Sequence, residues 1–259
     1  MPGSTSASTV ARDAPDFAVL PRARLREMAA AGGRIREIYR VLGKTGDNVV
    51  GEVLRDVGTF FEWDHYPKGD VYDAETHAQY YYHAHPVTLR GGEHGHFHTF
   101  LRPKGMPRNV RPADLPDVAP PPGDNDALSH LIAISMDRDG FPTRLFTTNR
   151  WVTGETWYAA EDVIAMLGRF RIDHARPSWP TNLWITALLR LFRPQIERLL
   201  RQRDAAVAEW RRRRPNRDAF EDREFEIASV EDISVDAQIA AVAAALRRRG
   251  QKREKRGHS

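Results

Sequence analysis

Residues 79–102, QYYYHAHPVTLRGGEHGHFHTFLR, hold five of the ten histidines of the 259-residue chain. The five are His83, His85, His94, His96 and His98, and Glu93 stands among them. Side chains alternate between the two faces of a β-strand. If the stretch forms two strands, the two histidines of 83–85 share one face of the first. The three histidines of 94–98 then share one face of the second.

The turn between these two strands decides whether the two sets of histidines meet. A two-residue turn at 91–92 or at 90–91 is of the kind that hairpins prefer, and either turn puts both sets on the same face. His85 then faces His98 or His96, respectively. A three-residue loop without a bulge would put the sets on opposite faces. On a shared face, opposite Cβ atoms lie about 4.5–5.5 Å apart, close enough for imidazoles to converge on one ion.

A histidine-lined hairpin suits a divalent metal. Three or four neutral imidazoles with one carboxylate fit Zn²⁺, Fe²⁺, Mn²⁺ or Cu²⁺. We therefore expect a metal-dependent enzyme, hydrolytic or oxidative, that acts on a small polar molecule. All five histidines are candidate ligands, and Glu93 is a candidate ligand or general base. A metal-free histidine site, or strand histidines with no site at all, are the alternatives.

The rest of the composition narrows the chemistry. The chain has no cysteine, which excludes disulfides, zinc–thiolate sites, iron–sulfur clusters and a cysteine nucleophile. Any metal must therefore be bound by His, Asp or Glu. Outside the histidine-rich stretch, Glu62 and His65 have the spacing of a di-iron bundle pair, but only one copy is present, so a surface pair is the plainer interpretation.

Two short motifs resemble known families. His83-Ala-His85 followed by Glu93 resembles the first cupin motif, although seven residues intervene where cupins have three or four. The run His94-Gly-His96-Phe-His98 is similar to the His-x-His-x-His signature of histidine-triad nucleotide hydrolases and transferases, with Gly95 in place of an apolar residue. That resemblance implies that His96 attacks a nucleotide α-phosphate, which is an alternative function.

Longer blocks resemble an uncharacterised bacterial family of unknown function. They are YYYHAHP at 80–86, GEHGHFHTFLRP at 92–103, HLIAISMD at 130–137 and LFTTNRWVTGETWYAAEDV at 145–163. The resemblance implies a soluble bacterial protein and supplies no activity.

The order of elements predicts an α+β fold. Helical patterns come first, then a mainly antiparallel sheet of about five strands, then C-terminal helices packed on it. Residues 1–16 are expected to be a disordered tail, 17–246 a single domain, and 247–259 a basic disordered tail. The proline-rich loop at 103–126 is expected to be a lid or a plain linker.

Two further groups could contact a ligand. Arg150, between a strand and a helix, could hold a carboxylate or phosphate, and it is a candidate catalytic residue; a structural salt bridge is the alternative. Residues 190–214 contain nine arginines against three acids. With the basic tail, they suggest a non-enzymatic binding or regulatory protein that contacts nucleic acid, or else a solvated face.

The distribution of charge and hydropathy along the chain indicates which partners and which location to expect. The net charge is +4, but 247–259 alone carry +6, which leaves −2 on the other 246 residues. Basicity is therefore local. No apolar run approaches the ~20 residues of a membrane span, and the N-terminus lacks a signal-peptide pattern. We expect a cytoplasmic protein with a small-molecule substrate and no membrane partner.

Overall fold

The computed structural model describes residues 17–85, 92–115 and 121–256. Within these residues, six strands form one antiparallel sheet, and each strand pairs with its neighbour in the chain. They are β1 (Tyr66–Tyr72), β2 (Ala78–His83), β3 (Gly95–Leu101), β4 (Ser129–Met136), β5 (Pro142–Thr148) and β6 (Ile227–Asp232). The predicted α+β class is confirmed, with six strands where about five were expected.

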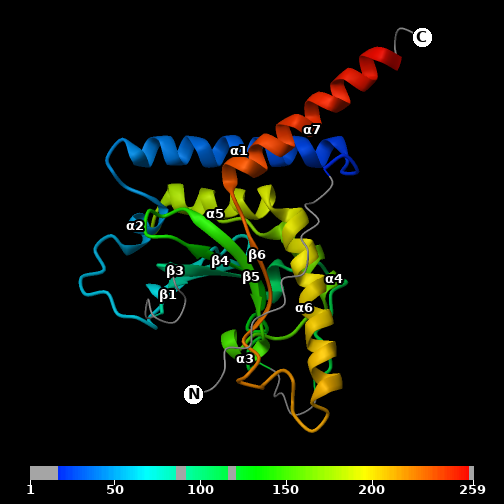
Figure 1. The fold of residues 1–259 in the computed structure, drawn as a ribbon. Helices are drawn as coiled ribbons and strands as arrows, with labels where there is room; N and C mark the ends of the chain where they lie inside the picture. Colours follow the sequence, from blue (N-terminus) through cyan, green and yellow to red (C-terminus); the bar gives the residue numbers. More distant parts are fainter. Residues whose placement is uncertain (1–16, 86–91, 116–120, 257–259) are drawn as a thin grey trace.

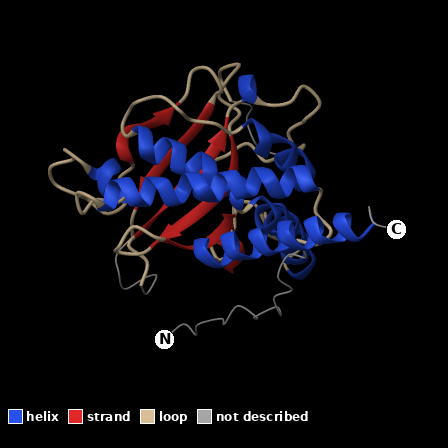
Figure 2. Ribbon diagram, turned by 90° about the horizontal axis from the view of Figure 1, so that it is seen from above, coloured by secondary structure: helices blue, strands red, loops and turns tan. Residues whose placement is uncertain are grey.

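The long helices lie over one face of this sheet (Figures 1 and 2). The helices are α1 (Arg22–Gly43), α2 (Val49–Leu54), α3 (Arg150–Thr153), α4 (Ala160–Met166), α5 (Trp179–Leu191), α6 (Arg193–Arg213) and α7 (Val235–Arg256), with 3₁₀ turns η1 (Pro103–Gly105) and η2 (Leu167–Arg169). Helix α1 packs on α5 and α7, and α6 packs on β6 and α4. The prediction that helices pack on an antiparallel sheet is therefore confirmed.

One face of the sheet packs in the hydrophobic core. Tyr80 and Tyr82 of β2 and Phe97 of β3 are fully buried. The Phe97 ring lies 5.6 Å from that of Trp184 on α5, and Tyr80 Oη donates to Asn182 Oδ1 at 2.6 Å. Because side chains alternate along a strand, the remaining residues of β2 and β3 point to the opposite face. That face carries the histidines.

Helix α7 approaches α1 closely at a glycine. A Cβ on Gly32 would lie 2.7 Å from Ile239 Cγ1 of α7, so the missing side chain makes room for the contact. Beyond this contact α7 continues to Arg256 and projects away from the other helices (Figure 1). The expectation that 247–259 are a disordered tail is therefore wrong as far as Arg256. Arg, Lys, Gln and Glu are good helix formers, and a helix already anchored on α1 extends through them.

Two local predictions need correction. Pro67 and Gly69 favour an irregular segment over residues 62–73, but the structure has β1 there, and its pairing with β2 shifts register between Tyr66 and Val71. Gly69 and Asp70 have positive φ there, which interrupts the alternation that marks a strand. The apolar spacing of residues 47–61 predicts one helix with Asp47 as its N-cap, but α2 ends at Leu54 and its N-cap is Asn48. The C-cap Arg55 is extended, with a ψ of 132°, and Asp56 and Gly58 follow it at positive φ.

The proline-rich loop is partly described. Residues 103–115 contain η1 and a single bridge from Pro112 to Tyr158. On the other side of the gap, Asp124 pairs with Lys104 and Asp126 with Arg102. A role as a lid stays a prediction. The tail expected over 1–16 lies outside the described residues.

Candidate functional site

The pairing of β2 with β3 brings histidines from both strands onto the face away from the helices. His83 pairs with His96, and Tyr81 pairs with His98. Residues 90 and 91, which both turns considered above include, fall outside the described residues, but the observed register differs from both predicted registers. It differs by an even number of residues, so the predicted sharing of one face by His83, His96 and His98 is confirmed.

Three histidines converge at the end of this strand pair. One ring nitrogen from each of His83, His85 and His96 can be chosen so that all three lie within 4.8 Å of one another. His83 Nε2 and His85 Nε2 are 3.0 Å apart. Metal–nitrogen bonds of 2.0–2.1 Å place two ligands of one ion about 3.0–3.4 Å apart. The His83–His85 pair has this spacing, and His96 lies within 4.8 Å of both; the three residues are called the three-histidine group below.

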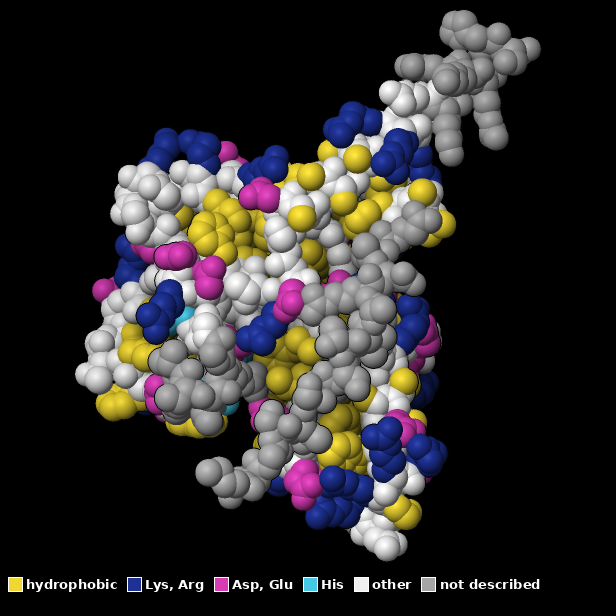
Figure 3. Space-filling model, viewed as in Figure 1, with side chains coloured by type: hydrophobic (Ala, Val, Ile, Leu, Met, Phe, Trp, Pro, Cys, Tyr) yellow, Lys and Arg dark blue, Asp and Glu magenta, His cyan; other side chains and the backbone are white. Residues whose placement is uncertain are grey.

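The group is partly buried. His96 is buried, whereas His83 and His85 are half-buried. Figure 3 accordingly shows only small areas of histidine surface on the face it presents. Burial lowers the pKa of His83 to about 3, and the neighbouring imidazoles of His96, His85 and His65 add to this effect. His83 is thus neutral near pH 7, and a neutral imidazole is the form that binds a cation.

A carboxylate orients the buried histidine. Glu93 Oε1 lies 2.7 Å from His96 Nδ1, and Arg144 Nη2 of β5 donates to Glu93 Oε2 at 3.2 Å. When Nδ1–H donates to Glu93, the lone pair of His96 lies on Nε2, the ring nitrogen that can act as a metal ligand. Histidines that bind metals are commonly held by a carboxylate in this way. The arrangement makes Glu93 a residue that positions His96, since both of its oxygens are engaged.

Further buried polar side chains follow His96 on the same face of the sheet. The rings of His96 and His98 are 4.8 Å apart, and His98 Nδ1 lies 3.1 Å from His130 Nε2. The backbone N–H of His130 donates to Glu155 Oε2 at 2.7 Å. Burial lowers the pKa of His130 to about 3 and raises the pKa of Glu155 to about 7. His130 therefore joins the cluster through His98.

His94 lies apart from the three-histidine group. Its Nδ1 is 2.6 Å from Oη of Tyr82, whose ring is on the helix-covered side. A Cβ on Gly95 would lie 2.5 Å from the same Oη, so the glycine leaves space for the tyrosine to pass. Strand β3 begins at Gly95, and the alternation that predicted a shared face does not extend to residue 94.

His65 is a neighbour that the sequence did not assign to the site. Its ring stacks on Tyr81 with centroids 3.6 Å apart, and it meets the His83 ring edge-on at 5.9 Å. His65 Nδ1 lies 3.1 Å from Asp70 Oδ1. The residue stands just before β1, so its position follows from a strand that the sequence pattern did not predict.

A match to a protein family includes all of the site residues described above. Residues 29–233 match a protein family described as a domain of unknown function, DUF6969. The chain belongs to this family. The resemblance to an uncharacterised family is thus confirmed, and the matched part of the DUF6969 chain includes every residue of the three-histidine group. No curated protein and no solved structure matches the chain.

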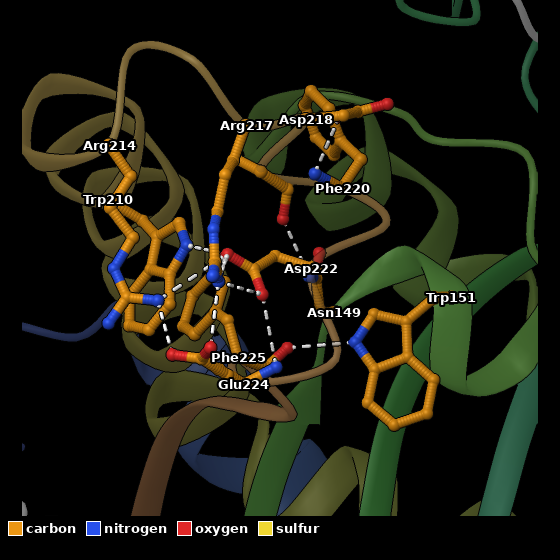
Figure 4. A network of polar contacts seen from close by, with 11 residues as sticks. Asn149, Trp151, Trp210, Arg214, Arg217, Asp218, Phe220, Asp222, Glu224 and Phe225 are labelled. Atoms are coloured by element: carbon orange, nitrogen blue, oxygen red, sulfur yellow. Dashed lines mark hydrogen bonds and ion pairs between the residues drawn. The ribbon is translucent and has the colours of Figure 1, made fainter.

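Arg150 of the DUF6969 chain forms a salt bridge within the chain. Its guanidinium pairs with Glu221, in the segment between α6 and β6. Figure 4 shows the network that fixes this segment around the Asp222 carboxylate, which accepts from Trp210 Nε1 at 3.0 Å and from Arg217 at 3.2 Å. Trp151, next to Arg150, donates to the carbonyl of Phe225 at 3.0 Å. These contacts favour the salt-bridge interpretation of Arg150.

Most arginines of α6, together with Arg214 directly after it, have acidic partners in the same chain, which leaves few of them for a phosphate backbone. The pairs are Arg193–Glu197, Arg198–Glu231, Arg201–Glu161, Arg203–Asp204, Arg212–Glu209, Arg213–Glu209 and Arg214–Glu224. Among the residues that the structure describes, no helix of the DUF6969 chain is both long enough and apolar enough to cross a bilayer.

Proposed function

We propose that this DUF6969 protein binds a divalent metal through His83, His85 and His96 and acts as a metal-dependent hydrolytic or oxidative enzyme on a small polar molecule. The observation that carries the proposal is the convergence of three imidazole nitrogens within 4.8 Å. The neutral state of His83 and the Glu93–His96 contact support it, because both prepare ring nitrogens to act as ligands.

The ligand set favours a catalytic over a structural centre. Structural zinc sites are closed by four protein ligands, whereas three histidines leave a position for water or substrate. The half-burial of His83 and His85 gives a small molecule access to that position. A bound metal would polarise a substrate oxygen or lower the pKa of a water molecule. Imidazole ligands suit zinc and iron better than manganese, which prefers oxygen.

The chain's own residues divide the remaining work. Glu93 and Arg144 fix the tautomer and direction of His96 from behind. Tyr81 and His98, paired across β2 and β3, line the same sheet face beside the group. A substrate bound at the open position would contact this face, while the opposite face stays in the core.

The test is metal analysis of protein purified without a histidine tag. We expect one equivalent of metal per chain, and its loss in His83→Ala and His96→Ala. His94→Ala is the matched control, since it removes a histidine of the same stretch that lies outside the group and should keep the metal. Substoichiometric metal that is unchanged in His83→Ala and His96→Ala would overturn the proposal.

One contact also suits a second candidate, a nucleotide hydrolase or transferase with a histidine nucleophile. The Glu93 carboxylate at His96 Nδ1 would strengthen Nε2 as a nucleophile as well as a ligand. That function requires a covalent nucleotide adduct on His96 and activity that survives chelators. The metal centre requires the opposite response to chelators.

A further inference from the structure

An exposed aromatic segment stands beside the three-histidine group. Between α2 and β1, the side chains of Phe61 and Trp63 are 57% and 56% exposed. Hydrophobic side chains gather over this segment at the lower left of Figure 3. Large aromatic side chains cost free energy when they face water, and exposed apolar patches commonly mark places where a ligand or partner binds.

The backbone of this segment is held in place although its side chains are exposed. The Trp63 N–H donates to the Ala84 carbonyl at 2.9 Å, which ties the segment to the residue between His83 and His85. The buried Tyr66 Oη accepts from the Phe61 N–H at 2.6 Å and donates to its carbonyl at 3.0 Å. The aromatic side chains are therefore presented from a fixed backbone.

Trp63 also has a backbone conformation that a tryptophan rarely adopts. Its φ is +74°, in the left-handed region where a Cβ is crowded and glycine is favoured. Core packing does not account for a bulky residue here, because more than half of the side chain is exposed. Strained residues of this kind are found at ligand-binding sites, where the ring itself has a use.

The indole lies at the edge of the three-histidine group. Its centroid is 4.3 Å from that of His85 with the rings perpendicular, and 6.2 Å from that of His83. A molecule bound at the open position beside these histidines would reach the exposed part of the indole with its next few atoms. Aromatic rings pair favourably with indole in offset-stacked or edge-to-face geometry.

We propose that Trp63 binds an aromatic ring of the substrate, so that the substrate class is a small aromatic molecule whose polar group reaches the metal. This inference rests on the proposed metal centre. Trp63 acts as a specificity residue: it selects the ring, and the histidines and metal bind the polar group.

The test compares two probes that share one metal-binding group, benzohydroxamate and acetohydroxamate, on the cobalt-loaded full-length protein. Binding is followed by the visible spectrum of the cobalt. We expect benzohydroxamate to bind about tenfold more tightly, the size of one aromatic pair. Trp63→Gly should remove this preference, so that the two probes bind equally well to the variant. Glycine is the right replacement because it adopts a φ of +74° without strain.

Trp179→Ala is the control, because Trp179 is 54% exposed at the start of α5 and should not affect the preference. Equal binding of the two probes to the wild type would overturn the inference and leave the metal centre standing. A preference that persists in Trp63→Gly would do the same. Failure of the wild type to bind cobalt would overturn the proposed function first, and this inference with it.

Discussion

Replacing Glu93 by glutamine tests how the carboxylate prepares His96. The carboxylate accepts on both oxygens, from His96 Nδ1 at 2.7 Å and from Arg144 Nη2 at 3.2 Å. A glutamine amide has one accepting oxygen and one donating nitrogen. In Glu93→Gln one of the two partners therefore faces an NH₂ group, and two donors oppose each other.

The size of the effect follows from what is lost. If the amide oxygen faces His96, the histidine keeps its tautomer but loses the negative charge behind it, and Arg144 meets the NH₂. If the amide turns, Nδ1 must accept, and the proton moves to the nitrogen needed for the metal. Losing such a partner typically costs 10–100-fold in metal affinity. We expect zinc affinity to fall by roughly that factor, about 1.4–2.7 kcal/mol.

The measurement is competition for zinc against a chromophoric chelator at constant pH, for wild type, Glu93→Gln and Arg144→Ala. Arg144→Ala leaves the Glu93–His96 contact in place and should lose less affinity than Glu93→Gln. Far-UV circular dichroism and urea unfolding of the apo proteins check that both variants fold. Wild-type affinity in Glu93→Gln would refute the idea that the carboxylate prepares a metal ligand.

Three further outcomes follow from the described contacts. The pKa of buried Glu155 is about 7 when folded and 4.5 otherwise, so the contribution of this residue to stability should fall by about 3 kcal/mol as pH rises from 4.5 to 7; urea titrations should show this fall as the difference between wild type and Glu155→Gln. Gly95→Ala places a Cβ 2.5 Å from Tyr82 Oη and 2.7 Å from the His83 carbonyl, and thermal unfolding should show a loss of about 1–3 kcal/mol. Adding zinc at 100 times its Kd should stabilise the wild type by about 2.7 kcal/mol in differential scanning fluorimetry, and His96→Ala should show no such shift.

The sequence was most informative in the strands, where the two-residue alternation of side chains determines which face each residue occupies. Alternation predicted the shared face of His83, His96 and His98, and that face survived because the register changed by an even number of residues. The same rule failed at His94, which stands one residue before β3 begins. Strand β1 was missed because positive φ at Gly69 and Asp70 breaks its alternation.

Contacts between distant parts of the chain were not predictable from local patterns. Glu93 was identified as a ligand or base, but its engagement depends on Arg144, 51 residues further along the chain. Arg150 was considered for catalysis, and its partner Glu221 lies 71 residues away. By contrast, Pro194 by itself predicts a break between two helices, because proline restricts its own segment of backbone, and α6 begins next to it.

The alternation of β3 has a consequence for how this strand tolerates mutation. Phe97 and Leu101 point into the core, while His96 and His98 face the site. Substitution scanning of β3 should therefore divide with a period of two. Changes at 97, 99 and 101 would lower expression and solubility, whereas changes at 96 and 98 would leave a folded protein with altered chemistry. Along this strand, the residues needed for folding and the residues needed for function therefore alternate.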